Sequence, residues 1–225
     1  MRLENRVVVI TGGTKGLGLA LAKLFIAKKS KVIVVSRSLD SDVFIEKSNP
    51  LYIKADVTIE NDVKKIVKTA IKRFGCVDVW INNAGIWTPH APIEKMNMKK
   101  IHEMIETNLF GTIYGSKHAL IGMRNQKSGV IVNIISSSAL DGSAGSSGYC
   151  ASKFAASGFT KSLRLEVCKD NINIVAVYTR GIKTNLFDKK RPKKYDDFMA
   201  PHYVAEKIVK NLERNNPLED LLIMH

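Results

Sequence analysis

Residues 11–18 read Thr11-Gly12-Gly13-Thr14-Lys15-Gly16-Leu17-Gly18 and follow directly on the apolar run Val7-Val8-Val9-Ile10. Glycine permits a tight turn and lets backbone N–H groups approach a phosphate at the positive end of a helix. The spacing is Gly-x-x-x-Gly-x-Gly, which differs from the Gly-x-Gly-x-x-Gly fingerprint. Glycine-rich turns also serve as plain strand-to-helix connections, so its position matters. Between a first strand and a first helix, this turn predicts an α/β fold that binds a nucleotide there.

Beyond this turn, the chain alternates short apolar runs with amphipathic segments, which is typical of βαβ units and a parallel sheet. The apolar runs are rich in β-branched residues, as expected for strands that are covered on both faces. We expect strands near residues 6–11, 31–36, 51–54, 77–82, 129–135, 172–178 and 220–224. We expect helices near residues 16–28, 60–74, 97–124, 148–168 and 201–214. The connection over residues 38–50 is too short for a comfortable helical crossover, so we expect it to be abbreviated.

These elements predict a single α/β domain over residues 1–225, a doubly wound parallel sheet of about seven strands with helices on both faces. A length of 225 residues suits one such domain with a full core, or two small domains at most. Apolar residues make up 45% of the chain and charged residues 25%, which excludes disordered and collagen-like classes. No apolar run approaches the ~18 residues of a membrane span.

The cysteines and histidines indicate the redox compartment and whether the protein holds a metal. Cys76, Cys150 and Cys168 are odd in number and lack ligand spacing, so they fit a reducing compartment and suggest neither a disulfide framework nor a zinc site. The histidines form no ligand pair, so we expect no metal. The first apolar run is too short for a signal peptide. We therefore expect a cytoplasmic protein.

The net charge of +14 admits nucleic acid, a membrane surface or anionic ligands as partners. The lysines are dispersed among acidic residues and lack interleaved aromatic residues, so a solvated surface is favoured over nucleic-acid binding. The exception is the basic run from Lys189 to Lys194. We interpret this run as a solvated face, with a flap that steers anionic ligands as the alternative.

Tyr149 and Lys153 form the motif Tyr-x-x-x-Lys within the helix expected near residues 148–168. Residues four apart share one helix face, so the two side chains can converge. A free phenol has a pKa of ~10, too high for efficient proton transfer at neutral pH. A nearby ammonium group favours the phenolate, so we expect Lys153 to lower the pKa of Tyr149. The motif alone is common on helices, and its surroundings give it weight.

Further motifs lie between the glycine turn and Tyr149: Asp56-Val57 after the third strand, Asn82-Asn83-Ala84-Gly85 after the fourth, and Asn108 in the following helix. With these motifs in this order, the sequence resembles the short-chain dehydrogenase/reductase family over essentially the whole chain. The family serine precedes the tyrosine by thirteen residues, which selects Ser136 over its neighbours Ser137 and Ser138. The residues that carry the resemblance are Gly12, Gly16, Gly18, Asp56-Val57, Asn82-Asn83-Ala84-Gly85, Asn108, Ser136, Tyr149 and Lys153.

The resemblance implies a Rossmann-type fold and a role for each matched residue. Tyr149 would donate a proton to a substrate carbonyl, and Ser136 would hold the carbonyl oxygen. Lys153 would assist the phenol and bond the cofactor ribose, and Asn108 would hold a water that links Lys153 to solvent. The implied cofactor contacts are Gly12, Thr14, Lys15, Gly16, Leu17, Gly18, Ser36, Arg37, Ser38, Asp56, Val57, Asn83, Ala84, Gly85, Tyr149, Lys153, Ile182 and Thr184.

The identity of the nicotinamide cofactor is read from the end of the second strand. An acidic residue there would bind the hydroxyls of the adenosine ribose and repel the 2′-phosphate that NADP carries on it. The sequence has Ser36-Arg37-Ser38 instead. Arg37 offers a planar cation suited to phosphate, and the serines can add hydroxyl donors. Lys15 lies in the glycine turn, where family members that prefer NADP often carry a base. The alternative is that both cations are surface charges; we predict NADP(H).

The main departure from the family follows the sixth strand, where Thr179-Arg180 stands in place of the usual Pro-Gly. We hypothesise that Arg180 points into the cleft and favours substrates with an anion or a second polar group, while a solvent-facing arginine is the alternative. Trp87 and Ser138 are further candidates for lining the substrate pocket, and His90 is interpreted as a surface residue.

The sequence therefore predicts an NADP(H)-dependent oxidoreductase that interconverts a small carbonyl compound and a secondary alcohol. An alternative is a catalytically silent binding protein on the same fold that senses NADP or associates with nucleic acid. Within enzymes, the alternative is a 3-ketoacyl-carrier reductase. The resemblance also implies a homodimer or homotetramer, with the helices near 97–124 and 148–168 pairing across a two-fold axis.

Overall fold

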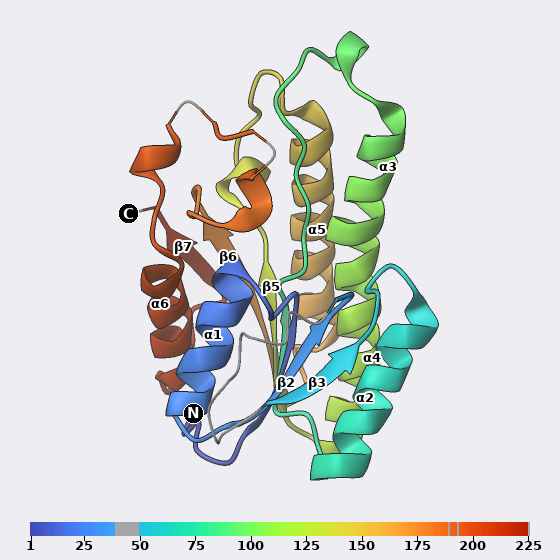
Figure 1. Cartoon of the computed structure of the whole chain (residues 1–225). Coiled ribbons are helices and arrows are strands. Elements are labelled where there is room, and N and C mark those ends of the chain that lie inside the picture. Colours follow the sequence, from blue (N-terminus) through green and yellow to red (C-terminus); the bar gives the residue numbers. More distant parts are fainter. Residues whose placement is uncertain (39–49, 189, 193, 225) are drawn as a thin grey trace.

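The computed structural model describes residues 1–38, 50–188, 190–192 and 194–224. Its centre is a seven-stranded sheet in the order β3-β2-β1-β4-β5-β6-β7, and every neighbouring pair is parallel (Figure 1). This order confirms the predicted doubly wound sheet, because the chain builds outward from β1 in one direction and then from β4 in the other. The expected abbreviated connection falls on residues 39–49, outside the described residues.

The strands lie where the β-branched runs predicted them, within two residues at each end. The largest difference is at β4, which begins at Val79, two residues after the expected start. The strands are β1 (Val7–Thr11), β2 (Lys31–Ser36), β3 (Leu51–Lys54), β4 (Val79–Asn82), β5 (Gly129–Ile134), β6 (Ile172–Thr179) and β7 (Asp220–Ile223).

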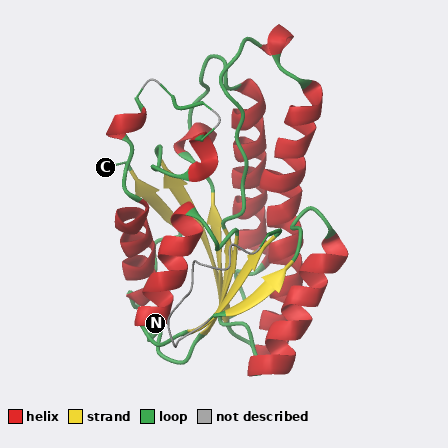
Figure 2. Ribbon diagram, in the orientation of Figure 1, coloured by secondary structure: helices red, strands yellow, loops and turns green. Residues whose placement is uncertain are grey.

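Helices cover both faces of the sheet, as Figure 2 shows. On one face, α1 (Gly16–Ala27) packs against α6 (Pro201–Glu213); on the other lie α2 (Glu60–Phe74), α4 (Gly111–Gln126) and α5 (Ser147–Glu166). Alternate residues of one strand therefore enter different cores. Val8 of β1 belongs to the core under α1 and α6, whereas Val9 belongs to the core under α2 and α4.

The helix expected near residues 97–124 is not one regular α-helix. It begins as α3 (Met98–Ile105), widens into the π-helical turn η3 (Glu106–Phe110), and continues as α4. Periodicity could not distinguish these forms, because one π-helical turn only shifts the apolar face. Asn108 lies in this turn, and π-helical turns are frequent at functional sites.

Within the described residues, four short 3-10 helices lie in the segments that follow the strands: η2 (Ile93–Lys95), η4 (Ser137–Ala139), η5 (Asn185–Phe187) and η6 (Tyr195–Asp197). Three of them lie in loops that leave the carboxyl ends of β4, β5 and β6, and η6 follows η5 in the last of these loops, so the loops gather at one end of the sheet (Figure 1). No helix within the described residues is both long enough and apolar enough to cross a membrane.

Candidate functional site

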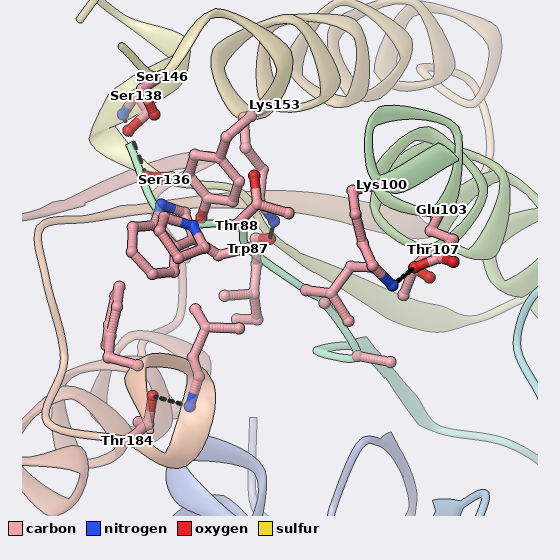
Figure 3. A pocket seen from close by; sticks show the side chains of 18 of the residues that line it. Trp87, Thr88, Lys100, Glu103, Thr107, Ser136, Ser138, Ser146, Lys153 and Thr184 are labelled. Carbon is pink, nitrogen blue, oxygen red and sulfur yellow. Dashed lines mark hydrogen bonds and ion pairs between the residues drawn. The ribbon is translucent and has the colours of Figure 1, made fainter. Parts of the chain in front are cut away.

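A cavity of about 1440 Å³ opens at the carboxyl ends of the strands, where a doubly wound sheet binds its ligands. It is lined by loops that follow β1, β2, β3, β4, β5 and β6, so it joins residues that lie far apart in the sequence (Figure 3). The predicted residues that line it are Gly12, Lys15, Gly16, Leu17, Arg37, Asp56, Asn83, Ala84, Gly85, Trp87, Ser136, Ser138, Tyr149, Lys153, Arg180, Ile182 and Thr184. The predicted residues outside the lining are Thr14, Gly18, Ser36, Ser38, Val57 and Asn108.

The glycine turn after β1 has the backbone geometry that glycine alone adopts freely. Gly12 and Gly16 have φ values of +63° and +50°, in the left-handed region where a Cβ causes strain. Gly18 has a different task, because a Cβ on it would collide with the backbone oxygen of Gly12 and the amide of Asn83. The third glycine thus lets α1 start close beneath the turn, and this explains why it does not itself line the cavity.

Thr11 and Asn83 fix this turn to the next strand of the sheet. The Asn83 amide donates to the backbone oxygens of Thr11 (2.9 Å) and Gly12 (3.1 Å). In return, the Thr11 hydroxyl accepts from the backbone N–H groups of Asn83 (3.0 Å) and Ala84 (3.1 Å). The loops after β1 and β4 are therefore one rigid unit. Sequence reasoning assigned Asn83 to the cofactor and gave Thr11 no role, although its place at the strand end was a signal.

A buried amide network lies directly beneath the cavity. Asn82 donates to Asn133 (2.8 Å) and accepts from the indole of Trp80 (2.7 Å), while Asn133 donates to Thr160 (2.9 Å). These polar groups are buried and fully bonded, so they tie β4, β5 and α5 together instead of destabilising the core. The roles of Asn133 and Thr160 were not predicted, because only side-chain packing shows them.

Asn108 lies beneath the loop after β4 and is 1% exposed. Its amide oxygen accepts from the N–H of Ile86 (2.8 Å), and its amide nitrogen donates to the Ile86 carbonyl (3.0 Å) and to the Ser152 hydroxyl (3.0 Å). The Ser152 hydroxyl donates in turn to the backbone oxygen of Tyr149 (2.7 Å). In this structure Asn108 therefore joins the loop after β4 to the helix of the tyrosine. Its expected hold on a water stays a prediction.

Tyr149 and Ser136 meet at the wall of the cavity. Burial raises the pKa of Tyr149 from 10.0 to about 12, and a hydrogen bond with the Ser136 side chain opposes part of this rise. We predicted that Lys153 lowers the pKa of Tyr149; this prediction is wrong, because the pKa is raised in this structure. The reason is that loss of water penalises the phenolate, while the Lys153 ammonium lies 5.9 Å from the centre of the Tyr149 ring. Ser136 also accepts from the N–H of Ser138 (3.1 Å), which holds its hydroxyl in place.

Lys153 is 6% exposed and extends from α5 to the end of β5. Its ammonium group donates to the backbone oxygen of Ile134 at 3.0 Å. Loss of water lowers the pKa of this group from 10.5 to about 8, because burial disfavours the charged form. A lysine with such a pKa can lose or gain a proton near neutral pH, whereas an exposed lysine stays charged there.

Two cations and one carboxylate line the part of the cavity next to β2 and β3, where the resemblance places the adenosine of the cofactor. Arg37 and Lys15 are exposed at its edge, and the Asp56 carboxylate accepts from the N–H and hydroxyl of Thr58, both at 2.9 Å. Ser36 donates to the backbone oxygen of Ser38. Neither serine lines the cavity, so their phosphate contacts stay predictions.

The predicted contacts of Thr14 and Val57 have no place on the cavity wall. Thr14 is buried within the glycine turn. Val57 is buried next to α4, since a Cβ on Gly111 would lie 3.0 Å from the Val57 side chain.

The loop after β6 closes the other end of the cavity. Arg180 is exposed and lines the cavity edge, so the structure is compatible with both interpretations of this residue. Ile182 pairs with Met199 in an isolated β-bridge. Thr184 caps η5 by accepting from the N–H of Leu186 (3.4 Å), and its methyl group lies against Gly16. Of the basic run from Lys189 to Lys194, residues 190–192 and Lys194 lie in this loop, and Lys189 and Lys193 are outside the described residues.

Several lining residues were missed because they lie in segments without a motif. Phe187 and Phe198 contribute aromatic rings from the loop after β6, and Lys100 and Glu103 form an ion pair of 2.6 Å at the opposite wall (Figure 3). His90, interpreted as a surface residue, is exposed and also lines the cavity. The described residues contain no group of three or more histidine, cysteine, aspartate or glutamate side chains that could hold a metal ion.

Comparisons with known proteins agree with this geometry. A model of the family described as short chain dehydrogenase matches residues 6–195. An uncharacterized oxidoreductase of Bacillus subtilis, YxnA, is 30% identical over 238 residues, which cover 99% of this chain and 66% of the relative. The chain thus spans slightly less than two thirds of that relative's length.

Two solved structures share the fold over nearly their whole length. The structure of ElxO with NADP bound is 30% identical with a TM-score of 0.89, covering 98% of this chain and 97% of that chain. A 3-ketoacyl-(acyl-carrier-protein) reductase from Brucella melitensis, complexed with NADH, is 25% identical with a TM-score of 0.90. It covers 99% of this chain and 98% of its own. These findings favour an oxidoreductase that uses a nicotinamide dinucleotide over a catalytically silent binding protein.

Proposed function

The chain belongs to the short-chain dehydrogenase family, and from this premise we propose that it interconverts a carbonyl compound and a secondary alcohol with NADP(H) as cofactor. The observation that carries the proposal is the convergence of Ser136, Tyr149 and Lys153 on the cavity that the glycine turn also lines. These residues come from the loop after β5 and from α5, so only the fold brings them to the glycine turn.

The glycine-rich surface of the cavity supports the binding of a dinucleotide. Gly12, Gly16 and Gly85 line it, so the backbone is exposed to a ligand without intervening side chains. A Cβ on Gly85 would lie 3.3 Å from Asn108 and 3.9 Å from the Lys153 ammonium, and it would fill the space beside the lysine. When bound, the nicotinamide supplies or accepts the hydride. The residues proposed to hold the cofactor are Gly12, Lys15, Gly16, Leu17, Arg37, Asp56, Asn83, Ala84, Gly85, Lys153, Ile182 and Thr184.

The protein's own groups would handle the proton. With a pKa of about 12, the Tyr149 phenol is protonated at neutral pH and can donate its proton to a substrate oxygen. Ser136 would donate a second hydrogen bond to that oxygen and stabilise the charge that develops on it. Lys153, with a pKa of about 8, would restore the proton that the phenol has given up.

The preference for NADP(H) over NAD(H) rests on charge at the adenosine end. Arg37 and Lys15 line this part of the cavity, and the end of β2 carries no carboxylate within the described residues. A guanidinium group suits a phosphate because its planar donors match the oxygen geometry. This arrangement would attract the 2′-phosphate that distinguishes NADP from NAD.

We also propose that the protein acts in the cytoplasm as a homodimer or homotetramer. The outer faces of α4 and α5 expose large apolar side chains: Ile121 is 54%, Phe154 45% and Leu165 76% exposed. Ala151, Ala155 and Gly158 are exposed on α5 as well, so a second helix could approach closely. Light scattering of the parent and of Phe154→Asp tests this: a monomeric parent would contradict the proposal.

The proposed activity is tested by following absorbance at the wavelength of the reduced cofactor. NADPH or NADH is mixed with the protein and a panel of ketones, diketones, aldehydes, keto acids and a 3-ketoacyl thioester. Oxidation of NADPH in preference to NADH supports the proposal, and the ranking of substrates identifies the alternative of a ketoacyl-carrier reductase. If no cofactor is oxidised and none binds in a titration, the proposal is wrong.

A further inference from the structure

Four aromatic side chains form a continuous cluster at one end of the cavity, here called the aromatic wall: Trp87, Phe187, Tyr195 and Phe198. Trp87 comes from the loop after β4, and the other three come from the loop after β6. The ring centres of Trp87 and Phe187 are 5.0 Å apart, and those of Phe187 and Phe198 are 5.2 Å apart. Tyr195 lies behind them, 5.5 Å from Phe198 and 6.1 Å from Phe187.

Three members of the aromatic wall face the cavity, and the fourth does not. Trp87, Phe187 and Phe198 line the cavity, whereas Tyr195 belongs to the wall without lining it. All four side chains are half-buried, so they are neither core residues nor free surface residues. Figure 3 shows Trp87 in the same part of the pocket as Ser136 and Lys153. A ligand at the catalytic group would therefore cover aromatic surface that is still in contact with water.

Gly181 provides the space for one of these rings. A Cβ on Gly181 would collide with three carbons of the Phe198 ring, so the ring packs directly on the glycine backbone. The pairing of the two ends of this loop, with Lys183 N–H bonded to Met199 (2.9 Å) and Met199 N–H bonded to Gly181 (3.0 Å), fixes Phe198 there. Backbone contacts around Gly181 thus hold the Phe198 side of the aromatic wall in place.

From this geometry we propose that Trp87, Phe187 and Phe198 make the enzyme selective for carbonyl compounds that carry a planar ring next to the carbonyl carbon. The inference rests on the proposed function and adds to it the class of substrate.

The angles between the rings favour a flat ligand. The Trp87 and Phe187 rings meet at 63°, and the Phe187 and Phe198 rings at 66°, so neighbouring rings form open corners. A planar ring in such a corner stacks on one face while it presents its edge to the next ring, an arrangement that aromatic groups prefer. A saturated ring of the same size fills the space but lacks the electrostatic match between ring edge and ring face.

The test compares acetophenone with cyclohexyl methyl ketone, which has the same carbon skeleton and a puckered ring. For each variant, kcat/KM is measured on both ketones with NADPH, and the acetophenone to cyclohexyl ratio is divided by the ratio of the parent. Intrinsic reactivity of the two ketones cancels in this quotient. We expect Phe187→Ala and Phe198→Ala to lower it roughly two- to tenfold.

Tyr195→Ala is the matched control, because it removes an aromatic ring of the same wall that does not itself line the cavity. It should leave the quotient within about twofold of unity. Phe187→Leu keeps an apolar side chain at this position and serves if Phe187→Ala fails to fold. Quotients near unity for both alanine variants, or for Phe187→Leu, would overturn the inference.

Tryptophan fluorescence gives a second readout that does not need turnover. The chain has two tryptophans, and Trp80 is fully buried, so a ligand in the cavity acts on Trp87. We expect acetophenone to quench the emission saturably in the presence of NADP⁺, and Trp87→Phe to abolish this saturable quenching. If no ketone is reduced but the quenching is present, the proposed function fails and the aromatic site stands. If ketones are reduced and the quenching is absent, the inference fails alone.

Discussion

The ammonium group of Lys153 donates a hydrogen bond of 3.0 Å to the backbone oxygen of Ile134, the last residue of β5. This contact ties the middle of α5 to the strand end that leads directly into Ser136. Two residues of the proposed catalytic set are thereby positioned by the same piece of backbone. The arrangement also buries a cation, and this has a measurable cost.

The burial of Lys153 predicts a pH dependence of stability. Its pKa falls from 10.5 to about 8 in the folded protein, so between these pH values the unfolded chain binds more protons and the free energy of unfolding rises with pH. Lys153→Met removes this contribution. The free energy of unfolding should therefore rise less from pH 7 to pH 10 in Lys153→Met than in the parent. We expect the two rises to differ by roughly 1–3 kcal/mol.

Denaturant unfolding at both pH values measures this effect. Lys161→Met is the matched control, because Lys161 is exposed on the same helix. Tyr149 does not interfere, since its pKa is raised and its contribution is lost only as the pH rises from 10 towards 12. An identical pH dependence in the parent and Lys153→Met would contradict this account of the buried lysine.

The charge at the adenosine end predicts how the cofactor preference responds to mutation. In Arg37→Glu, a carboxylate at the end of β2 would repel a 2′-phosphate and accept ribose hydroxyls. We expect the ratio of kcat/KM for NADPH to that for NADH to fall by roughly 10- to 100-fold, the value of a hydrogen bond to a charged group. Lys31→Glu makes the same charge change at the opposite end of the strand and should leave the ratio unchanged. Equal effects of both variants would mean that net charge, not contact, sets the preference.

The contacts of Asn108 predict a structural role that exceeds that of Ser152. Asn108→Ala leaves both backbone groups of Ile86 without their partner, and each unsatisfied group costs about 1–3 kcal/mol where water does not replace it. Ser152→Ala removes one acceptor of the Asn108 amide and the hydroxyl donor to the Tyr149 carbonyl, but both bonds between Asn108 and the backbone of Ile86 stay. Urea unfolding should therefore rank Asn108→Ala as the less stable variant. The reverse order would contradict the assignment of Asn108 as the anchor of the loop after β4.

Because Gly181 lies against the Phe198 ring, we predict that even an alanine at position 181 lowers the stability of the protein. Gly181→Ala forces the Phe198 ring to move, and overpacking of this kind costs about 1–3 kcal/mol. Gly142→Ala is the control, because nothing lies within 4 Å of a Cβ at that loop position. Thermal unfolding should separate the two variants. If they unfold at the same temperature, the aromatic wall is not fixed at its base.

The sequence predicted the sheet well because strands that are covered on both faces leave an unmistakable pattern. Runs such as those of β2 and β5 contain consecutive β-branched residues, and the helices between them begin and end near the expected residues. The π-helical turn around Asn108 was not predicted. Its signature is one extra residue in a helical period, which composition and periodicity do not register.

The candidate site was predicted to the extent that motifs define it. Gly12, Tyr149 and Lys153 line one cavity, and they could be chosen from the sequence because their spacing belongs to local turns and helix faces. The pKa of Tyr149 was predicted in the wrong direction, since spacing places a lysine nearby but gives no measure of buried volume. Phe187 and Phe198 were missed because their meeting with Trp87 depends on the path of a whole loop.

The most direct test of the account is a comparison of NADPH oxidation by the parent, Tyr149→Phe and Tyr203→Phe on whichever ketone the parent reduces fastest. Tyr149→Phe removes only the hydroxyl that would give up the proton, and Tyr203→Phe makes the same change on α6, outside the cavity lining. We predict that Tyr149→Phe lowers kcat by roughly 10²- to 10⁴-fold, with NADPH binding retained, and that Tyr203→Phe has the activity of the parent. A Tyr149→Phe variant as active as the parent would contradict the assignment of Tyr149 as the proton donor.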